Sequence, residues 1–184
     1  LLSTSATPVL TIPVPDDGEL YGPHAGTSVP VVLVVCYPTD ADNPYADYVL
    51  PTGKSVPHMQ RGGDPPRLAS TRARWPVLLY SHGYAGSPIS GDYIAVLTRL
   101  ASHGYAVVAP FHGDQRIANL RLEDASDLLQ AIANFSKFTA MQAVRPLALA
   151  AALDHVLGGP DWKDRLDATQ VAGFPGIFAH GMLT

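Results

Sequence analysis

The sequence contains only one cysteine, so disulfide bonds within the chain cannot stabilise its fold. One cysteine cannot form an internal bridge, which excludes a disulfide-stapled scaffold and leaves the redox compartment undetermined. Cys36 lies in an apolar run, where a free cysteine typically behaves as a small buried hydrophobic residue.

The sequence also lacks a basic block and a long hydrophobic run. The sequence contains 12 lysines and arginines and 16 acidic residues, which gives a net charge of −4. We therefore expect no nucleic-acid partner. The longest apolar run, 31–36, has six residues, whereas a membrane span needs roughly 20. We therefore expect a soluble protein, cytoplasmic or secreted after processing. Because the chain begins Leu1-Leu2, without methionine, we expect a processed product or a fragment.

Low-complexity composition is absent as well. Glycine and proline together make 33 of 184 residues, and 47% of the residues are hydrophobic, which is typical of a globular protein. The length predicts one domain over 1–184 that buries a core and contains many turns.

Short apolar runs predict five strands. The run Val29–Tyr37 is β-branched and nearly continuous, which favours a buried strand, while Pro13 restricts the run 9–14 to a sheet edge. The other strands are expected at 77–80, 105–109 and 170–174. Apolar spacing predicts helices at 88–103, 120–138 and 141–157.

The order of these elements predicts the fold class. A strand, a helix and a second strand follow one another from 77 to 109, which is a βαβ unit with a parallel strand pair. We expect an α/β fold whose mostly parallel sheet of about five strands has flanking helices.

The segment 38–76 predicts a long loop. It contains seven prolines, several glycines and no sustained hydrophobic period, and it is far longer than an ordinary connection. Three of its side chains could line a pocket or simply pin the loop to the core: Tyr45, Tyr48 and Met59.

The most informative loop follows the run 77–80. Gly83 beside His82 stands at the expected carboxyl end of a buried strand, where backbone N–H groups can approach a developing oxyanion without a side chain in the way. A generic strand-to-helix connection with a glycine is the alternative interpretation.

Three stretches carry a family resemblance: WPVLLYSHG at 75–83, LASHGYAVVAP at 100–110 and VVCYP at 34–38. They closely resemble the α/β-hydrolase superfamily, nearest its dienelactone hydrolase and platelet-activating factor acetylhydrolase-like branch. The resemblance covers roughly 29–174. It implies a partial α/β-hydrolase fold and a serine-type carboxylic ester hydrolase, with the backbone N–H of Tyr84 as one oxyanion donor in the loop His82-Gly83-Tyr84.

The same resemblance implies a nucleophile elbow after the strand 170–174. The residues there run from Pro175 through Gly176 to Ile177, and none can attack a carbonyl carbon. Seven residues follow Ile177, too few for the later acid and histidine. We therefore expect an incomplete C-terminal part, and truncation, a frameshift after Phe174 and a natural short form stay open.

Other candidate residues give weaker signals. His112 and Asp114 follow the strand 105–109 and could shape a pocket, or they could form a polar turn. Ser81 lacks the glycine two positions earlier that a tight elbow needs. The histidines show no metal-ligand spacing, and no phosphate-binding glycine loop is present, so we expect no metal and no cofactor.

Two functions remain from the sequence. The first is a serine esterase that acts on a small-molecule ester, and the second is an inactive binding or scaffold fragment of an α/β-hydrolase. A sheet that stops at its fifth strand would leave an edge uncovered, so self-association through that edge is a further expectation.

Overall fold

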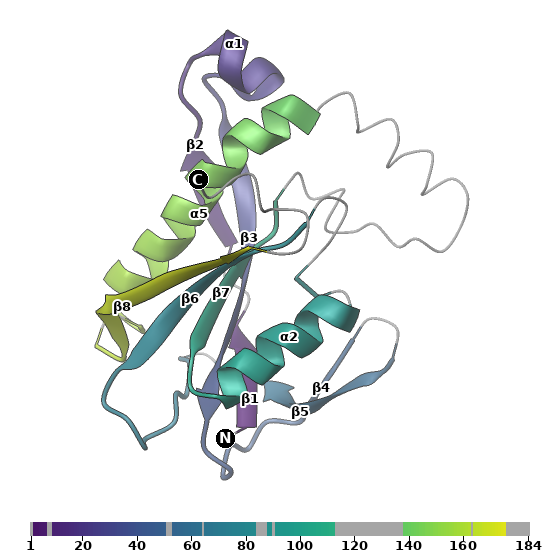
Figure 1. Cartoon of the computed structure of the whole chain (residues 1–184), viewed down its shortest axis with the longest axis vertical. Helices are drawn as coiled ribbons and strands as arrows, with labels where there is room; N and C mark the ends of the chain where they lie inside the picture. Colours follow the sequence, from purple (N-terminus) through teal and green to yellow (C-terminus); the bar gives the residue numbers. More distant parts are fainter. Residues whose placement is uncertain are drawn as a thin grey trace.

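The structure is a computed structural model. It describes the residues 2–6, 9–50, 53–63, 65–83, 88–89, 91–112, 138–162 and 164–175. Their strands join one sheet in the order β4-β5-β1-β3-β7-β6-β8, with β2 paired to β3 beside this path (Figure 1). The strands are β1 Leu2–Ala6, β2 Val9–Pro13, β3 Ser28–Thr39, β4 Asp47–Val49, β5 Ser55–Arg61, β6 Trp75–Ser81, β7 Ala106–Pro110 and β8 Leu166–Pro175.

The predicted α/β class is confirmed. All five predicted strands are present as β2, β3, β6, β7 and β8, and β6 pairs in parallel with both β7 and β8. The helix α2, Gly91–Ser102, connects β6 to β7 and completes the predicted βαβ unit. The sheet is mixed, because β3 runs antiparallel to β7, β2 and β1.

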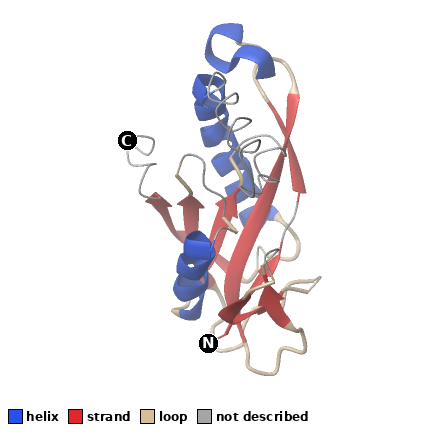
Figure 2. Cartoon of the chain, turned by 90° about the vertical axis from the view of Figure 1, so that its right-hand side faces the viewer, coloured by secondary structure: helices blue, strands red, loops and turns tan. Residues whose placement is uncertain are grey.

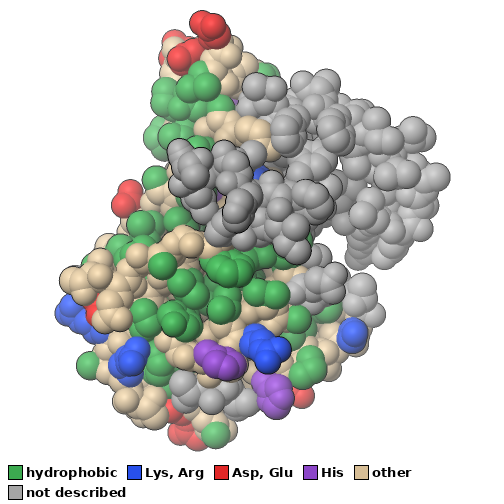
Figure 3. Space-filling model, viewed as in Figure 1, with side chains coloured by type: hydrophobic (Ala, Val, Ile, Leu, Met, Phe, Trp, Pro, Cys, Tyr) green, Lys and Arg blue, Asp and Glu red, His purple; other side chains and the backbone are tan. Residues whose placement is uncertain are grey.

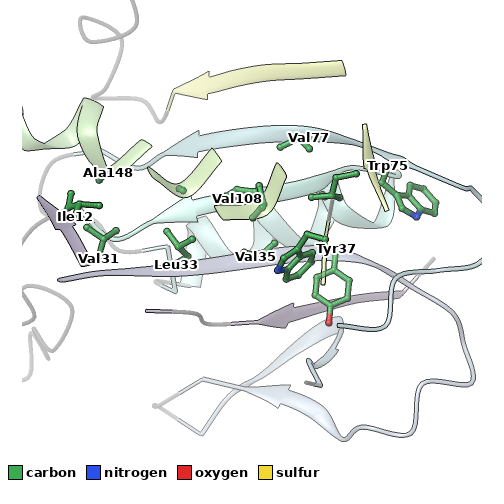
Figure 4. Close-up of a cluster of buried hydrophobic side chains, with 14 of the residues drawn as sticks. Ile12, Val31, Leu33, Val35, Tyr37, Trp75, Val77, Val108 and Ala148 are labelled. Carbon is green, nitrogen blue, oxygen red and sulfur yellow. The ribbon is translucent and has the colours of Figure 1, made fainter. Parts of the chain in front are cut away.

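The sheet is the middle of three layers, with helices beside it in Figure 2. Alternate residues of β3 enter two separate cores, as the period of two along a strand requires. Leu33, Val35 and Tyr37 belong to the core beneath α5, which Figure 4 shows, while Val34 and Cys36 belong to the core beneath α2. The two helices therefore cover opposite faces.

The helix α5, Phe138–Gly158, confirms the helix predicted at 141–157 and begins earlier. Pro146 lies in the helix interior, where it removes one backbone hydrogen bond. The helix persists because a buried stripe holds it against the sheet: Val144, Ala148, Ala152 and Val156. The helix expected at 120–138 falls almost wholly outside the described residues.

The prediction of a loop over the whole segment 38–76 is wrong, because β4 and β5 lie within it. Backbone pairing explains them: β5 pairs with both β4 and β1, while only Val56 and Met59 of its side chains are buried. Pro57 argued against a strand here in the sequence, but it is not one of the residues that pair with β4 or β1. The short N-terminal helices α1, Gly18–Tyr21, and η1, Gly22–His24, were not predicted.

Gly104 ends the turn after α2 and provides a test of the fold. Its φ is +97°, and a Cβ there would lie 3.2 Å from Trp75 Cζ3. We expect Gly104→Ala to lower the free energy of unfolding by about 1 to 2 kcal/mol, because an L side chain is strained at positive φ. Urea unfolding measures this. Gly158→Ala is the matched control, since a Cβ there meets nothing within 4 Å, and an equal loss in both variants would contradict the explanation.

The strand β8 forms one end of the sheet and pairs, among the described residues, with β6 alone. Positions 168–174 are all exposed, and their larger apolar members are Val171 and Phe174. Figure 3 shows hydrophobic side chains gathered across the middle of one face of the molecule.

None of the described helices has the length and apolar character that a membrane span needs.

Candidate functional site

The carboxyl ends of β6 and β7 bring the main candidate residues together (Figure 1). Ser81 ends β6, His82 and Gly83 follow it, and His112 stands two residues after β7. The side chains of Ser81, His82 and His112 are all buried, between 2% and 3% exposed. The carboxyl edge of parallel strands is where α/β proteins bind ligands.

The hydrogen bonds of His82 fix the position of its proton. Its Nε2 accepts the backbone N–H of His112 at 3.2 Å, so this nitrogen carries no hydrogen. The proton is therefore on Nδ1, which donates to the carbonyl oxygen of Gly83 at 2.8 Å. The ring of His82 is neutral and is held at both nitrogens.

Burial keeps both histidines neutral. The pKa of His82 is lowered to about 4, mainly by desolvation; the bond to Gly83 raises it, and the positive charge of Arg145 lowers it. Desolvation also lowers the pKa of His112 well below its usual range, and His82 and Arg145 add to the effect. The two rings lie 4.8 Å apart between centroids, and charging either would place a cation beside its neighbour.

Ser81 has a partner that the sequence did not reveal. Its Oγ lies 2.9 Å from Nε2 of His112, so the bond ties the end of β6 to the segment after β7. Ser81 is part of a strand and stands opposite Pro175 of β8 in the ladder, so it does not occupy a strand-to-helix elbow. This contact therefore holds the edge of the sheet together.

Arg145 is the residue that sequence analysis missed. It lies on α5 and is 4% exposed, and its Nη2 donates to the carbonyl oxygen of His82 at 3.1 Å. Desolvation lowers the pKa of its guanidinium to about 10, so it is charged at neutral pH. The one available signal was an arginine within the alanine- and leucine-rich stretch of that helix.

The end of β8 lies beside these residues. Pro175 pairs with Ser81, and Phe174 stacks on Tyr80 with ring centroids 5.7 Å apart. Position 175, one of the two expected nucleophile positions, thus lies beside the His82-Gly83 loop at the same edge of the sheet.

Several predicted site residues fall outside the described part of the chain: Tyr84, Asp114 and Ile177. The structure brings together His82, Gly83 and His112, and the pocket predicted around His112 and Asp114 stays a prediction. Among the described residues, no cluster of three or more histidines, cysteines and acidic residues could hold a metal ion.

Comparison with known proteins identifies one matching family. Residues 63–143 match the family model of platelet-activating factor acetylhydrolase, isoform II. This match contains β6, α2, β7, the His82-Gly83 loop and His112. A search of curated proteins finds no match.

Two solved structures are also similar to this chain. A ferulic acid esterase from Streptomyces cinnamoneus is 18% identical, covers 94% of this chain and 51% of its own, and has a TM-score of 0.44. A dienelactone hydrolase-like promiscuous phosphotriesterase from metagenomic libraries is 16% identical, covers 92% of this chain and 49% of its own, and has a TM-score of 0.41. The chain spans about half the length of these two proteins.

The stretch WPVLLYSHG at 75–83 lies within the residues that match the family model. Over residues 63–143 the chain resembles the platelet-activating factor acetylhydrolase family, and its mixed sheet with a helix on each face is an α/β fold.

Proposed function

We propose that this chain carries the oxyanion loop of a serine-type carboxylic ester hydrolase. The observation that supports this is the buried His82-Gly83 pair at the carboxyl end of β6, within the residues that match the acetylhydrolase family and beside the end of β8. Open α/β sheets bind ligands at this edge.

In the proposed reaction, a serine Oγ attacks the ester carbonyl carbon while a histidine takes the serine proton. The carbonyl oxygen becomes an oxyanion, and the backbone N–H of Tyr84 donates to it. The intermediate collapses, the alcohol leaves with the proton from the histidine, and water then releases the acid from the acyl-enzyme. One such donor contributes about 10²- to 10³-fold to the rate.

The nucleophile of this reaction is not found at the position where the family pattern places it. Neither Pro175 nor Ile177 has a side chain that can attack a carbonyl carbon. We therefore expect the 184-residue chain by itself to leave esters unhydrolysed, and the complete site to need residues that this sequence does not contain.

The test compares the 184-residue chain with the product of the full coding sequence and its flanks. Both are incubated with p-nitrophenyl butyrate and with a fluorophosphonate probe, after circular dichroism has verified that each is folded. We expect ester turnover and one labelled serine in the longer product, and neither in the shorter chain. A longer product that is folded and inert overturns the proposal, as does labelling of Ser81 in either protein.

The alternative function is a binding or scaffold fragment that does not turn over. The absence of a nucleophile at 175–177 favours it. This function is supported if the coding sequence ends with residue 184 and the folded chain neither hydrolyses the ester nor reacts with the probe.

We also propose that the open edge of β8 is a surface for self-association. Its support is the single pairing of β8, to β6, and the exposure of Val171 and Phe174 among the described residues. An unpaired strand edge is a template for another strand.

A further inference from the structure

We propose that Arg145 is a positioning residue for the oxyanion loop and that it acts through His82. The inference rests on the proposed ester hydrolysis for its purpose, although the contacts that carry it do not depend on that reaction. Arg145 comes from α5 and the loop comes from β6, 63 positions apart in the sequence, so α5 reaches across to fix the loop.

The first contact orients the peptide group between His82 and Gly83. Its carbonyl oxygen accepts a hydrogen bond from Arg145 Nη2 at 3.1 Å. In a planar trans peptide group the N–H points opposite to the C=O. A carbonyl held by Arg145 therefore directs the N–H of Gly83 away from α5.

The second contact orients the next peptide group. The carbonyl oxygen of Gly83 accepts the Nδ1–H of His82 at 2.8 Å. This bond holds the carbonyl group of Gly83 toward the histidine ring. Two successive carbonyl groups are thus tied to partners, which leaves the N–H of Gly83 to face an oxyanion.

The ring that makes the second contact is itself fixed. The backbone N–H of His112 binds Nε2 of His82 at 3.2 Å, so the ring cannot turn over without losing both of its bonds. The charged guanidinium also polarises the peptide group that it binds, which makes the N–H of that group a better donor. Arg145 therefore affects both the direction and the strength of the Gly83 N–H donor.

The contacts are tested first by NMR on the folded 184-residue chain. We expect Arg145 to show separate, slowly exchanging Nη–H signals, and His82 to show the nitrogen shifts of the Nδ1–H tautomer at pH 7. An averaged Nη signal like that of the exposed Arg99, or the opposite tautomer of His82, overturns the proposal.

Variants then separate positioning from general stability. In Arg145→Gln we expect the carbonyl ¹³C signals of His82 and Gly83 to move. Arg165→Gln is the matched control, because Arg165 Nη2 also donates to a backbone carbonyl, that of Ala69 at 2.8 Å, and we expect it to leave both signals in place. If Arg145→Gln does not fold, Arg145→Lys replaces it, since lysine keeps the charge and loses the planar fork. Unmoved signals in the Arg145 variant contradict the proposal.

Kinetic measurements on the longer, active product are the last test of the proposal. We expect Arg145→Gln to lower kcat about 10-fold with KM unchanged, because an oxyanion donor binds the transition state and not the ester. Arg165→Gln should change neither constant. If the NMR contacts are present and the longer product is inert, ester hydrolysis is the part that fails. If the product is active and Arg145→Gln keeps full kcat, the positioning role is the part that fails.

Discussion

Lowering the pH from 7 to 4 is expected to reduce the free energy of unfolding by at least about 3 kcal/mol. The pKa of His82 falls from its usual 6.5 to about 4 in the fold, and each unit of difference corresponds to about 1.4 kcal/mol. The unfolded chain therefore takes up the proton first as the pH decreases. The stabilisation is complete above pH 6.5 and is lost as the pH approaches 4. His112, whose pKa is lowered in the same direction, adds to the loss.

Urea unfolding at pH 7, 6, 5 and 4 measures this dependence. We expect His82→Gln to flatten the curve between pH 6.5 and 4, because glutamine does not titrate. His103→Gln is the control, since His103 is exposed at the end of α2. Equal slopes in the wild type and His82→Gln would show that the buried ring does not cause the acid sensitivity.

The hydrophobic runs predicted the central strands because those strands are stabilised by side-chain burial. The five residues of β7 are all buried, and in β3 every position from 33 to 39 is buried. The strands β1, β4 and β5 have polar or proline-containing sequences and are held largely by backbone pairing, which leaves no hydrophobic period to read. Sequence patterns therefore predicted β3 and β7 and missed β1, β4 and β5.

The sequence also predicted one part of the candidate site and missed another. His82 and Gly83 were found because a strand run ends just before them, and that position is visible in the sequence. Arg145 was missed because its contact with the loop spans 63 positions. The neutral Nδ1–H tautomer of His82 follows from two hydrogen-bond distances, and no residue pattern encodes it.

At micromolar concentration we expect the 184-residue chain to self-associate through β8. The ladder places Phe174 beside Tyr80, which belongs to the core beneath α2, and places Val171 beside Val77, which belongs to the core beneath α5. Val171 and Phe174 are 38% and 43% exposed, so both faces of β8 have apolar surface in contact with water. Pairing with a second strand would bury that surface and satisfy the edge of β8 that has no partner strand among the described residues.

The composition of this edge favours a second copy of the chain as the occupant. The stretch 168–174, ATQVAGF, contains no charged residue, so it has none of the lysines that usually guard an exposed edge. Two copies paired antiparallel about Val171 would form a two-fold symmetric contact in which no like charges meet. The net charge of −4 gives only weak overall repulsion.

Light scattering and sedimentation over a concentration series test this expectation. We expect the wild type to shift from monomer to larger species as concentration rises, and Val171→Lys to remain monomeric, because a lysine in the edge must be desolvated for pairing. Val96→Lys is matched to it in exposure, 39% against 38%, but lies on α2. If β8 is the contact, Val96→Lys associates as the wild type does. The β8 edge is not the surface through which copies meet if the wild type is monomeric at every concentration. The same holds if Val171→Lys and Val96→Lys are monomeric to the same extent.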